Sequence, residues 1–425
     1  AVGFEAGLSI TTGTNNTLIG GVAGDAITTG GNNVAVGTTA LGSNTTGANN
    51  IGIGNSALGA LTTAAGITAV GNGAGLSVTT GAGNSFFGAN AGDSVTTGAN
   101  NTIIGANAGM DLTTGGSNTF VGEEAGQNAV GSANTFLGAF AGENYSSGAN
   151  NVGVGRAALL GVDGSSSGNN NVSIGYNSML ANTTGASNTA IGTQALDANT
   201  SGSSNTAVGD NALGLCTTGT LNVAIGVLAG QDVTTATELV AIGYDAGGSV
   251  TTGSNNVCIG RNAANHDVTL QGGSQNIVIG DFNDVSDANA TNQIVLGYNI
   301  TAPSNNHFLF GKPSNVVSNN FTSNATFARS SDVNKKTNIE DTDLGLSFIN
   351  ELRPVTFNWK PNSEFPKHYN DYNEHENNMD TETNLYGMIA QDVEKALDKV
   401  GHKNFGGWSE DKDGSQRLAQ GMFIY

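Results

Sequence analysis

Two serines and two lysines lie close together in the stretch SSDVNKKTNI, residues 330–339: Ser330, Ser331, Lys335 and Lys336. A serine hydroxyl is a weak nucleophile at neutral pH, but a lysine amine whose pKa is lowered by burial can accept its proton. Ser331 and Lys336 are five positions apart. This spacing fits a turn or a short loop in which the serine hydroxyl could attack a carbonyl carbon. Spacing alone does not single out this pair, because Lys335 is an alternative base and Ser330 an alternative nucleophile.

The residues that follow have the periodicity of a small globular domain. Apolar residues recur at helical spacing in residues 344–352 and 389–397, and residues 353–360 alternate in the manner of a strand. Pro354 favours an end of the first helix just before it. We therefore expect a small α+β domain over residues 331–425.

The residues before this stretch form a glycine-rich repeat. Gly20, Gly37 and Gly54 each close a short apolar segment, and the interval between them is 17 residues. The register continues to Gly297, with two intervals of 20 residues (155 to 175 and 260 to 280) and one of 16 residues. A fixed period of this length is typical of a solenoid, in which insertions lie in turns.

Each repeat contains a pattern of alternating residues that predicts a short strand. The residue before the glycine is apolar and the residue two positions earlier is usually β-branched, whereas the residue between them varies, as in Ala35, Phe86 and Cys258. This middle residue should face a different environment from its neighbours. An asparagine opens each strand, so that Asn33 stacks on Asn16 and the side-chain amides can form a ladder of hydrogen bonds.

We call each repeat of the solenoid a rung. Rungs stacked about 4.8 Å apart, the spacing of paired strands, predict a rod of about 80 Å over residues 1–300. One rung has few large apolar residues, so we expect three chains to share a core along the axis. The predicted fold is mainly β: a trimeric parallel β-solenoid, or β-roll, of 17-residue rungs. A connector over residues 301–330 then leads to the small α+β domain.

Composition limits the classes of partner. The chain has 64 Gly, 5 Pro and a formal net charge of −20, which argues against nucleic acid and anionic membranes as partners. No run of about 18 apolar residues is present, so we predict no membrane insertion. Cys216 and Cys258 occupy repeat positions that are small or polar elsewhere, and both are interpreted as structural.

Two clusters of potential metal ligands are considered, and neither leads us to predict a metal or another cofactor. His368 and His375 lie in an acidic, Asn-rich segment, 362–384, but their spacing fits no standard metal site. Three aspartates in the last long turn of the rod could bind calcium or could belong to a solvated loop: Asp281, Asp284 and Asp287. We favour solvated loops for both clusters.

Three motifs resemble, in order, the intramolecular chaperone of endosialidase, a peptidase S74 domain at the C-terminus of phage tail spikes and fibres: SDVNKKTNI, LGLSFINELRPVTFNWK and YGMIAQDVEKAL. The resemblance implies a homotrimeric chaperone that assembles the upstream β-fold and then releases itself by a single self-cleavage. It assigns Ser331 as nucleophile and Lys336 as base, and it places the cut between Ser330 and Ser331. Asn334 stands where many members carry arginine, and residues 422–425 lie about where the trimeric C-terminal helix of the family begins.

The repeats are similar to the head repeats of trimeric autotransporter adhesins and to NNTAVGYQAG-type repeats of phage fibres. Together the resemblances imply a homotrimeric phage tail fibre, located on the virion, that attaches to a host-surface glycan or protein. A bacterial surface adhesin is the alternative. A glycan depolymerase is less favoured, because the repeat shows no paired carboxylates at a fixed, cleft-like spacing, and the adjacent Glu123 and Glu124 suit a solvated turn.

Overall fold

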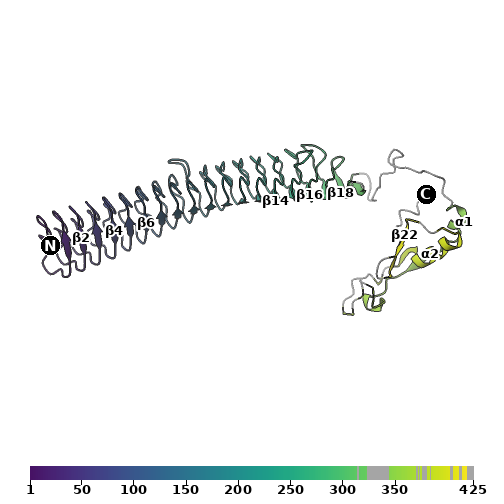
Figure 1. Cartoon of the computed structure of the whole chain (residues 1–425), viewed down its shortest axis with the longest axis horizontal. Coiled ribbons are helices and arrows are strands. Elements are labelled where there is room, and N and C mark those ends of the chain that lie inside the picture. The colour runs from purple at the N-terminus through teal and green to yellow at the C-terminus, as the bar shows by residue number, and fades with distance from the viewer. Residues whose placement is uncertain are drawn as a thin grey trace. The chain divides into compact units, whose positions relative to one another are not determined.

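The computed structural model describes residues 1–313, 315–322, 344–369, 372, 374–375, 381–382, 384–402, 405–410 and 414–418. The chain divides into two compact units, Ala1–Arg329 and Ser330–Tyr425. The first unit is a stack of short strands (Figure 1). The described part of the second unit combines short helices with two small sheets.

The first unit contains one short strand in each rung. The strands are β1 (Thr17–Ile19), β2 (Val34–Val36), β3 (Ile51–Ile53), β4 (Thr68–Val70), β5 (Ser85–Phe87), β6 (Thr102–Ile104), β7 (Thr119–Val121), β8 (Thr135–Leu137), β9 (Val152–Val154), β10 (Val172–Ile174), β11 (Thr189–Ile191), β12 (Thr206–Val208), β13 (Val223–Ile225), β14 (Val240–Ile242), β15 (Val257–Ile259), β16 (Ile277–Ile279) and β17 (Ile294–Gly297). Neighbours pair in parallel and in repeat register, so that Thr17 lies beside Val34 and Val34 beside Ile51. The predicted β-solenoid of 17-residue rungs is confirmed.

Glycines at the strand ends allow the rungs to stack closely. Gly20 and Gly37 have φ of 139° and 133°, in the region that favours glycine. A Cβ on Gly20 would also collide with the carbonyl oxygen of Gly37 in the next rung. Both the backbone conformation and the close approach therefore require glycine at this position of the repeat.

The middle residue of each strand points into the rung. Leu18, Ala35 and Phe86 are at most 1% exposed, whereas the residues on either side of them are partly or fully exposed. The expectation that the rung core must be shared by three chains is wrong, because these residues pack with buried turn residues such as Leu41 and Leu58 inside one chain. The buried apolar side chains of one chain, such as Leu58, Leu61 and Ile67 in a single repeat, therefore fill the interior of a rung.

The predicted asparagine ladder connects side chains to the main chain of the next rung. The Asn16 side-chain oxygen accepts the backbone N–H of Asn33 at 2.9 Å, and the Asn33 oxygen accepts that of Asn50 at 3.0 Å. The Asn33 amide nitrogen also donates to the carbonyl of Gly47 at 3.0 Å. Each buried amide therefore satisfies polar main-chain groups that the strands leave unpaired.

A β-hairpin follows the last rung. Strand β18 (His307–Lys312) pairs in parallel with β17 and antiparallel with β19 (Asn315–Asn320). Both strands of this hairpin lie within residues 301–330, the segment that was expected to be a connector.

The second unit has the predicted element types, with changed bounds. In chain order its elements are α1 (Leu346–Ile349), β20 (Pro354–Phe357), the 3₁₀-helix η2 (Asn362–Glu364), β21 (Leu385–Met388), α2 (Ala390–Lys399), β22 (Trp408–Glu410) and β23 (Gln416–Leu418). β20 pairs antiparallel with β21, and β22 with β23. A small core joins α1 to α2, with Phe348 packed near Val393 and Leu397.

Candidate functional site

The predicted cleavage residues lie outside the described part of the chain. Ser330, Ser331, Lys335 and Lys336 belong to the segment 323–343, for which the structure gives no geometry. The assignment of Ser331 as nucleophile and Lys336 as base therefore stays a prediction.

Two ion pairs connect helix α2 to the residues between α1 and β20. Arg353 donates to the Asp392 carboxylate at 2.6 Å, which joins the start of β20 to α2. The hydrogen bond from Arg353 lowers the pKa of Asp392, and the charges of Arg353 and Lys395 act in the same direction. Lys399 similarly reaches Glu351 at 2.6 Å. These contacts join the segment between α1 and β20 to helix α2.

The outer face of the long sheet carries a continuous row of side chains without a charge. We call this row the outer stripe and define it as the first and third residues of strands β1 to β17. It contains Ile, Val, Leu, Phe, Thr and Ser only. Its most exposed large members are Ile19, Ile51, Ile53, Phe87, Ile104, Leu137, Ile174, Ile191, Ile225, Ile277 and Ile279. In a chain with 34 acidic residues, such a charge-free face is a candidate interaction surface.

A shallow hollow of about 290 Å³ lies beside the first 20-residue interval, with Arg156 and Glu143 among its lining residues. The Arg156 guanidinium stands 5.4 Å from the Phe140 ring centroid and 5.9 Å from that of Tyr176. Burial, together with the charges of Glu124 and Asp163, raises the pKa of Glu143. Glu143 is the only carboxylate among the lining residues, so the hollow lacks the paired acids that most glycoside hydrolysis uses.

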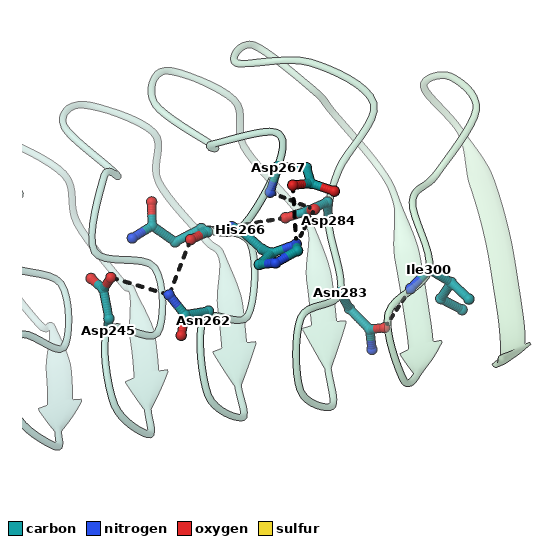
Figure 2. Close-up of polar contacts among 8 residues, drawn as sticks. Asp245, Asn262, His266, Asp267, Asn283, Asp284 and Ile300 are labelled. Carbon is teal, nitrogen blue, oxygen red and sulfur yellow. Dashed lines mark hydrogen bonds and ion pairs between the residues drawn. The ribbon is translucent and has the colours of Figure 1, made fainter. Parts of the chain in front are cut away.

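A histidine and two aspartates converge at the second 20-residue interval (Figure 2). The Nδ1 atom of His266 lies 3.5 Å from an Asp267 oxygen and 3.7 Å from an Asp284 oxygen. His266 and Asp267 are exposed, whereas the Asp284 side chain is 1% exposed. The sequence pattern did not identify His266 or Asp267, although the longer interval marked this rung as unusual.

The three aspartates considered for calcium have separate roles. Asp281 accepts the backbone N–H of Arg261 at 3.0 Å, and Asp287 accepts that of Asn289 at 2.9 Å. Only Asp284 joins the cluster with His266. Within the described residues, His368 and His375 form no comparable group of three potential ligands.

Both cysteines are free thiols in the rod core. Cys216 and Cys258 are fully buried. Burial raises the pKa of Cys216 to about 11 and that of Cys258 to about 12. A thiolate is the reactive form of cysteine, and a raised pKa keeps both thiols protonated near neutral pH. Both side chains are therefore assigned a structural role and not that of nucleophiles.

The second unit is similar to a known protein family. Residues 331–402 match the family model described as peptidase S74, chaperone of endosialidase. No curated protein and no solved structure gave a significant match to the chain. None of the helices in the described ranges has the length and apolar character needed to cross a bilayer.

Proposed function

We propose that the chain is a homotrimeric phage tail fibre that attaches to a host-surface receptor, with a C-terminal chaperone that directs trimer assembly. The match of residues 331–402 to the chaperone of endosialidase supports assembly of the preceding fold. The single observation that carries the trimer is the outer stripe, because it offers three identical chains a matching surface along the whole rod.

Charge and area favour copies of the same chain as the occupants of the outer stripe. The chain carries a formal charge of −20, so association of three copies needs a contact that keeps their carboxylates apart. The outer stripe contains no carboxylate and extends over the 17 strands β1 to β17, or about 80 Å at the spacing of paired strands. A three-residue strand is about 10 Å long, so the face covers about 800 Å², which is the area that each partner buries in a typical interface.

A charged residue in the outer stripe tests this interface. Ile104→Asp combined with Ile191→Asp would bring carboxylates together at two levels of the trimer, so we expect native mass spectrometry to show mainly single chains. Ile104 and Ile191 are 39% and 38% exposed, which spares the rung core. The matched control is Thr114→Asp at an exposed turn residue, and it should leave the trimer intact. Trimers of equal abundance in both variants would reject the outer stripe as the interface.

We further propose that the chain cuts itself once, between Ser330 and Ser331, after the rods have assembled. The Ser331 hydroxyl attacks the carbonyl carbon of Ser330, Lys336 takes the hydroxyl proton, and the amide nitrogen leaves with a proton. The resulting ester, which joins Ser330 to the Ser331 side chain, is hydrolysed by water. Intact-mass measurement should show two fragments for the wild type, and one uncut chain for Ser331→Ala and for Lys336→Ala. Cutting of Ser331→Ala at the same bond would contradict the assignment, and Lys335→Ala tests the alternative base.

A further inference from the structure

We propose that His266, Asp267 and Asp284 form a binding site for a divalent first-row transition cation, with Zn²⁺ as the preferred ion. The donor atoms are one imidazole nitrogen and one oxygen from each carboxylate, and all three lie within 4.8 Å of one another. Two come from the inserted loop after Gly260, and the third comes from the next rung. Figure 2 shows the three side chains turned toward one another.

The spacing of the donors is close to what a zinc ion requires. Zinc binds nitrogen and oxygen ligands at about 2.0–2.2 Å in tetrahedral geometry, which puts neighbouring donors about 3.3–3.5 Å apart. The distances from His266 Nδ1 to the two carboxylates are 3.5 and 3.7 Å. Small side-chain movements would therefore complete three protein ligands and leave the fourth position for water.

Asp284 is fixed in place before any ion binds. One oxygen of its buried carboxylate accepts the backbone N–H of His266 at 3.0 Å, and the other accepts that of Asp267 at 2.9 Å. The neighbouring Asn283 accepts the N–H of Ile300 at 3.2 Å, which ties this segment to the following rung (Figure 2). Hydrogen bonds that orient a ligand in this way strengthen metal sites.

Electrostatics also favours a cation. Asp284 is 1% exposed, and His266 supplies its only ion-pair contact in the described structure. The two backbone hydrogen bonds offset part of the cost of burying this carboxylate, and a bound cation would offset more of it. The imidazole favours zinc and its neighbours over calcium, which takes six to eight oxygen ligands. The His266 ring also packs on Phe282 at 4.8 Å between centroids, which limits its rotation.

The ion would connect the inserted loop to the stack. His266 and Asp267 lie in the longer interval between Gly260 and Gly280, where the 17-residue pattern is interrupted. Asp284 follows that interval, so one ion would join two rungs. We therefore expect metal binding to slow hydrogen exchange of the His266 and Asp267 backbone N–H groups.

Cobalt provides a direct probe, because Co²⁺ in a four-coordinate site absorbs visible light strongly. Untagged full-length chain should take up one Co²⁺ per chain with that absorption and release it when Zn²⁺ is added. His266→Ala should bind at least about tenfold more weakly, since even outer partners of a metal site contribute 10–100-fold. His307→Ala is the matched control, because His307 is only partly buried and lies in the same unit, where it contacts Ser304.

Two results would overturn the proposal: absence of the four-coordinate cobalt spectrum in the wild type, or equal binding by His266→Ala and wild type. Asp267→Ala gives a second test that keeps Asp284 and its backbone contacts. It should also weaken binding while the circular dichroism spectrum of the rod stays unchanged. Wild-type affinity in Asp267→Ala would remove that residue from the site and contradict the three-ligand set.

Discussion

At the scale of single residues, the rod core contains buried polar groups whose hydrogen-bond partners also lie inside the core. Tyr145 is fully buried and packs against Phe136, with ring centroids 6.4 Å apart. Its hydroxyl oxygen accepts hydrogen bonds from the side-chain amides of Asn171 at 3.1 Å and Asn182 at 2.9 Å. Burial raises the pKa of Tyr145 to about 12, so the phenol stays neutral in the folded rod.

Tyr145→Phe should therefore destabilise the rod. The substitution keeps the ring but removes the acceptor for two buried amides, which costs about 1–3 kcal/mol. The denaturant midpoint of unfolding measures the effect. Tyr176→Phe is the control, because Tyr176 is 47% exposed and should change the midpoint little. Equal midpoints for Tyr145→Phe and the wild type would show that the two hydrogen bonds do not contribute.

The buried thiols predict a dependence of stability on pH. Their pKa values are raised from 9.0 to about 11 for Cys216 and about 12 for Cys258, so the unfolded chain ionises first as the pH rises. The stability that they contribute is complete below about pH 9 and is lost between pH 9 and 12. The Cys216→Ala, Cys258→Ala double variant should lose less stability than the wild type between pH 9 and 11. Parallel pH profiles would contradict this prediction.

The alternation and the 17-residue period predicted the strands and their stacking, but not which face of each strand is buried in the rung. Ile, Val and Thr on the outer stripe are as apolar as many core residues. Alternation therefore shows that the two faces differ without showing that the variable middle residue is the buried one. His266 could not be placed from the pattern, because it lies in a longer interval where the repeat no longer fixes a position.

At the scale of elements, the asparagine ladder connects rungs that share few large side chains. The Asn101 oxygen accepts the backbone N–H of Asn118 at 2.9 Å, and its amide donates to the Gly115 carbonyl at 3.0 Å. Asn101 is 1% exposed, so water cannot replace these contacts without opening the rung. The ladder therefore gives the stack specificity for register as well as stability.

Asn101→Ala should open the stack locally. The Asn118 N–H and the Gly115 carbonyl would be left unpaired in the core, at a cost of about 1–3 kcal/mol for each group. Hydrogen exchange read by mass spectrometry should show faster exchange in β6 and β7 than in distant strands, because each rung contacts only its neighbours. Thr97→Ala, at an exposed turn residue, serves as the control and should leave exchange unchanged. Uniform protection in Asn101→Ala would argue that the ladder adds no local stability.

The contacts of the second unit differ from those of the first. A small apolar core and exposed ion pairs join its elements, and it contains none of the repeats that stack in the rod. Three elements were predicted at residues 344–352, 353–360 and 389–397, and all three are present with changed bounds. The bounds differ because helix ends depend on tertiary contacts, such as the one between Arg353 and Asp392 at 2.6 Å. The assignment of Ser331 and Lys336 as cleavage residues rests only on the resemblance to a family, since a Ser and a Lys at this spacing carry little information alone.

At the scale of the whole molecule, the chain combines a highly acidic composition with a charge-free face along its rod. Each rung completes its own core, so trimer formation is not needed to fill the rod interior. In the proposed trimer, association would instead cover the outer stripe, which in the single chain exposes apolar side chains along about 80 Å of paired strands. In the proposed function, a chaperone of the type that residues 331–402 resemble would bring three chains together in register before the proposed cut.

The most direct test of the trimer is the mass of the wild-type particle at sedimentation equilibrium under native conditions. We predict a single species of three chains over a wide range of protein concentration, whether or not the second unit has been cut off. A single-chain mass for the folded rod at micromolar concentration would contradict the trimer and leave the outer stripe without its proposed occupant.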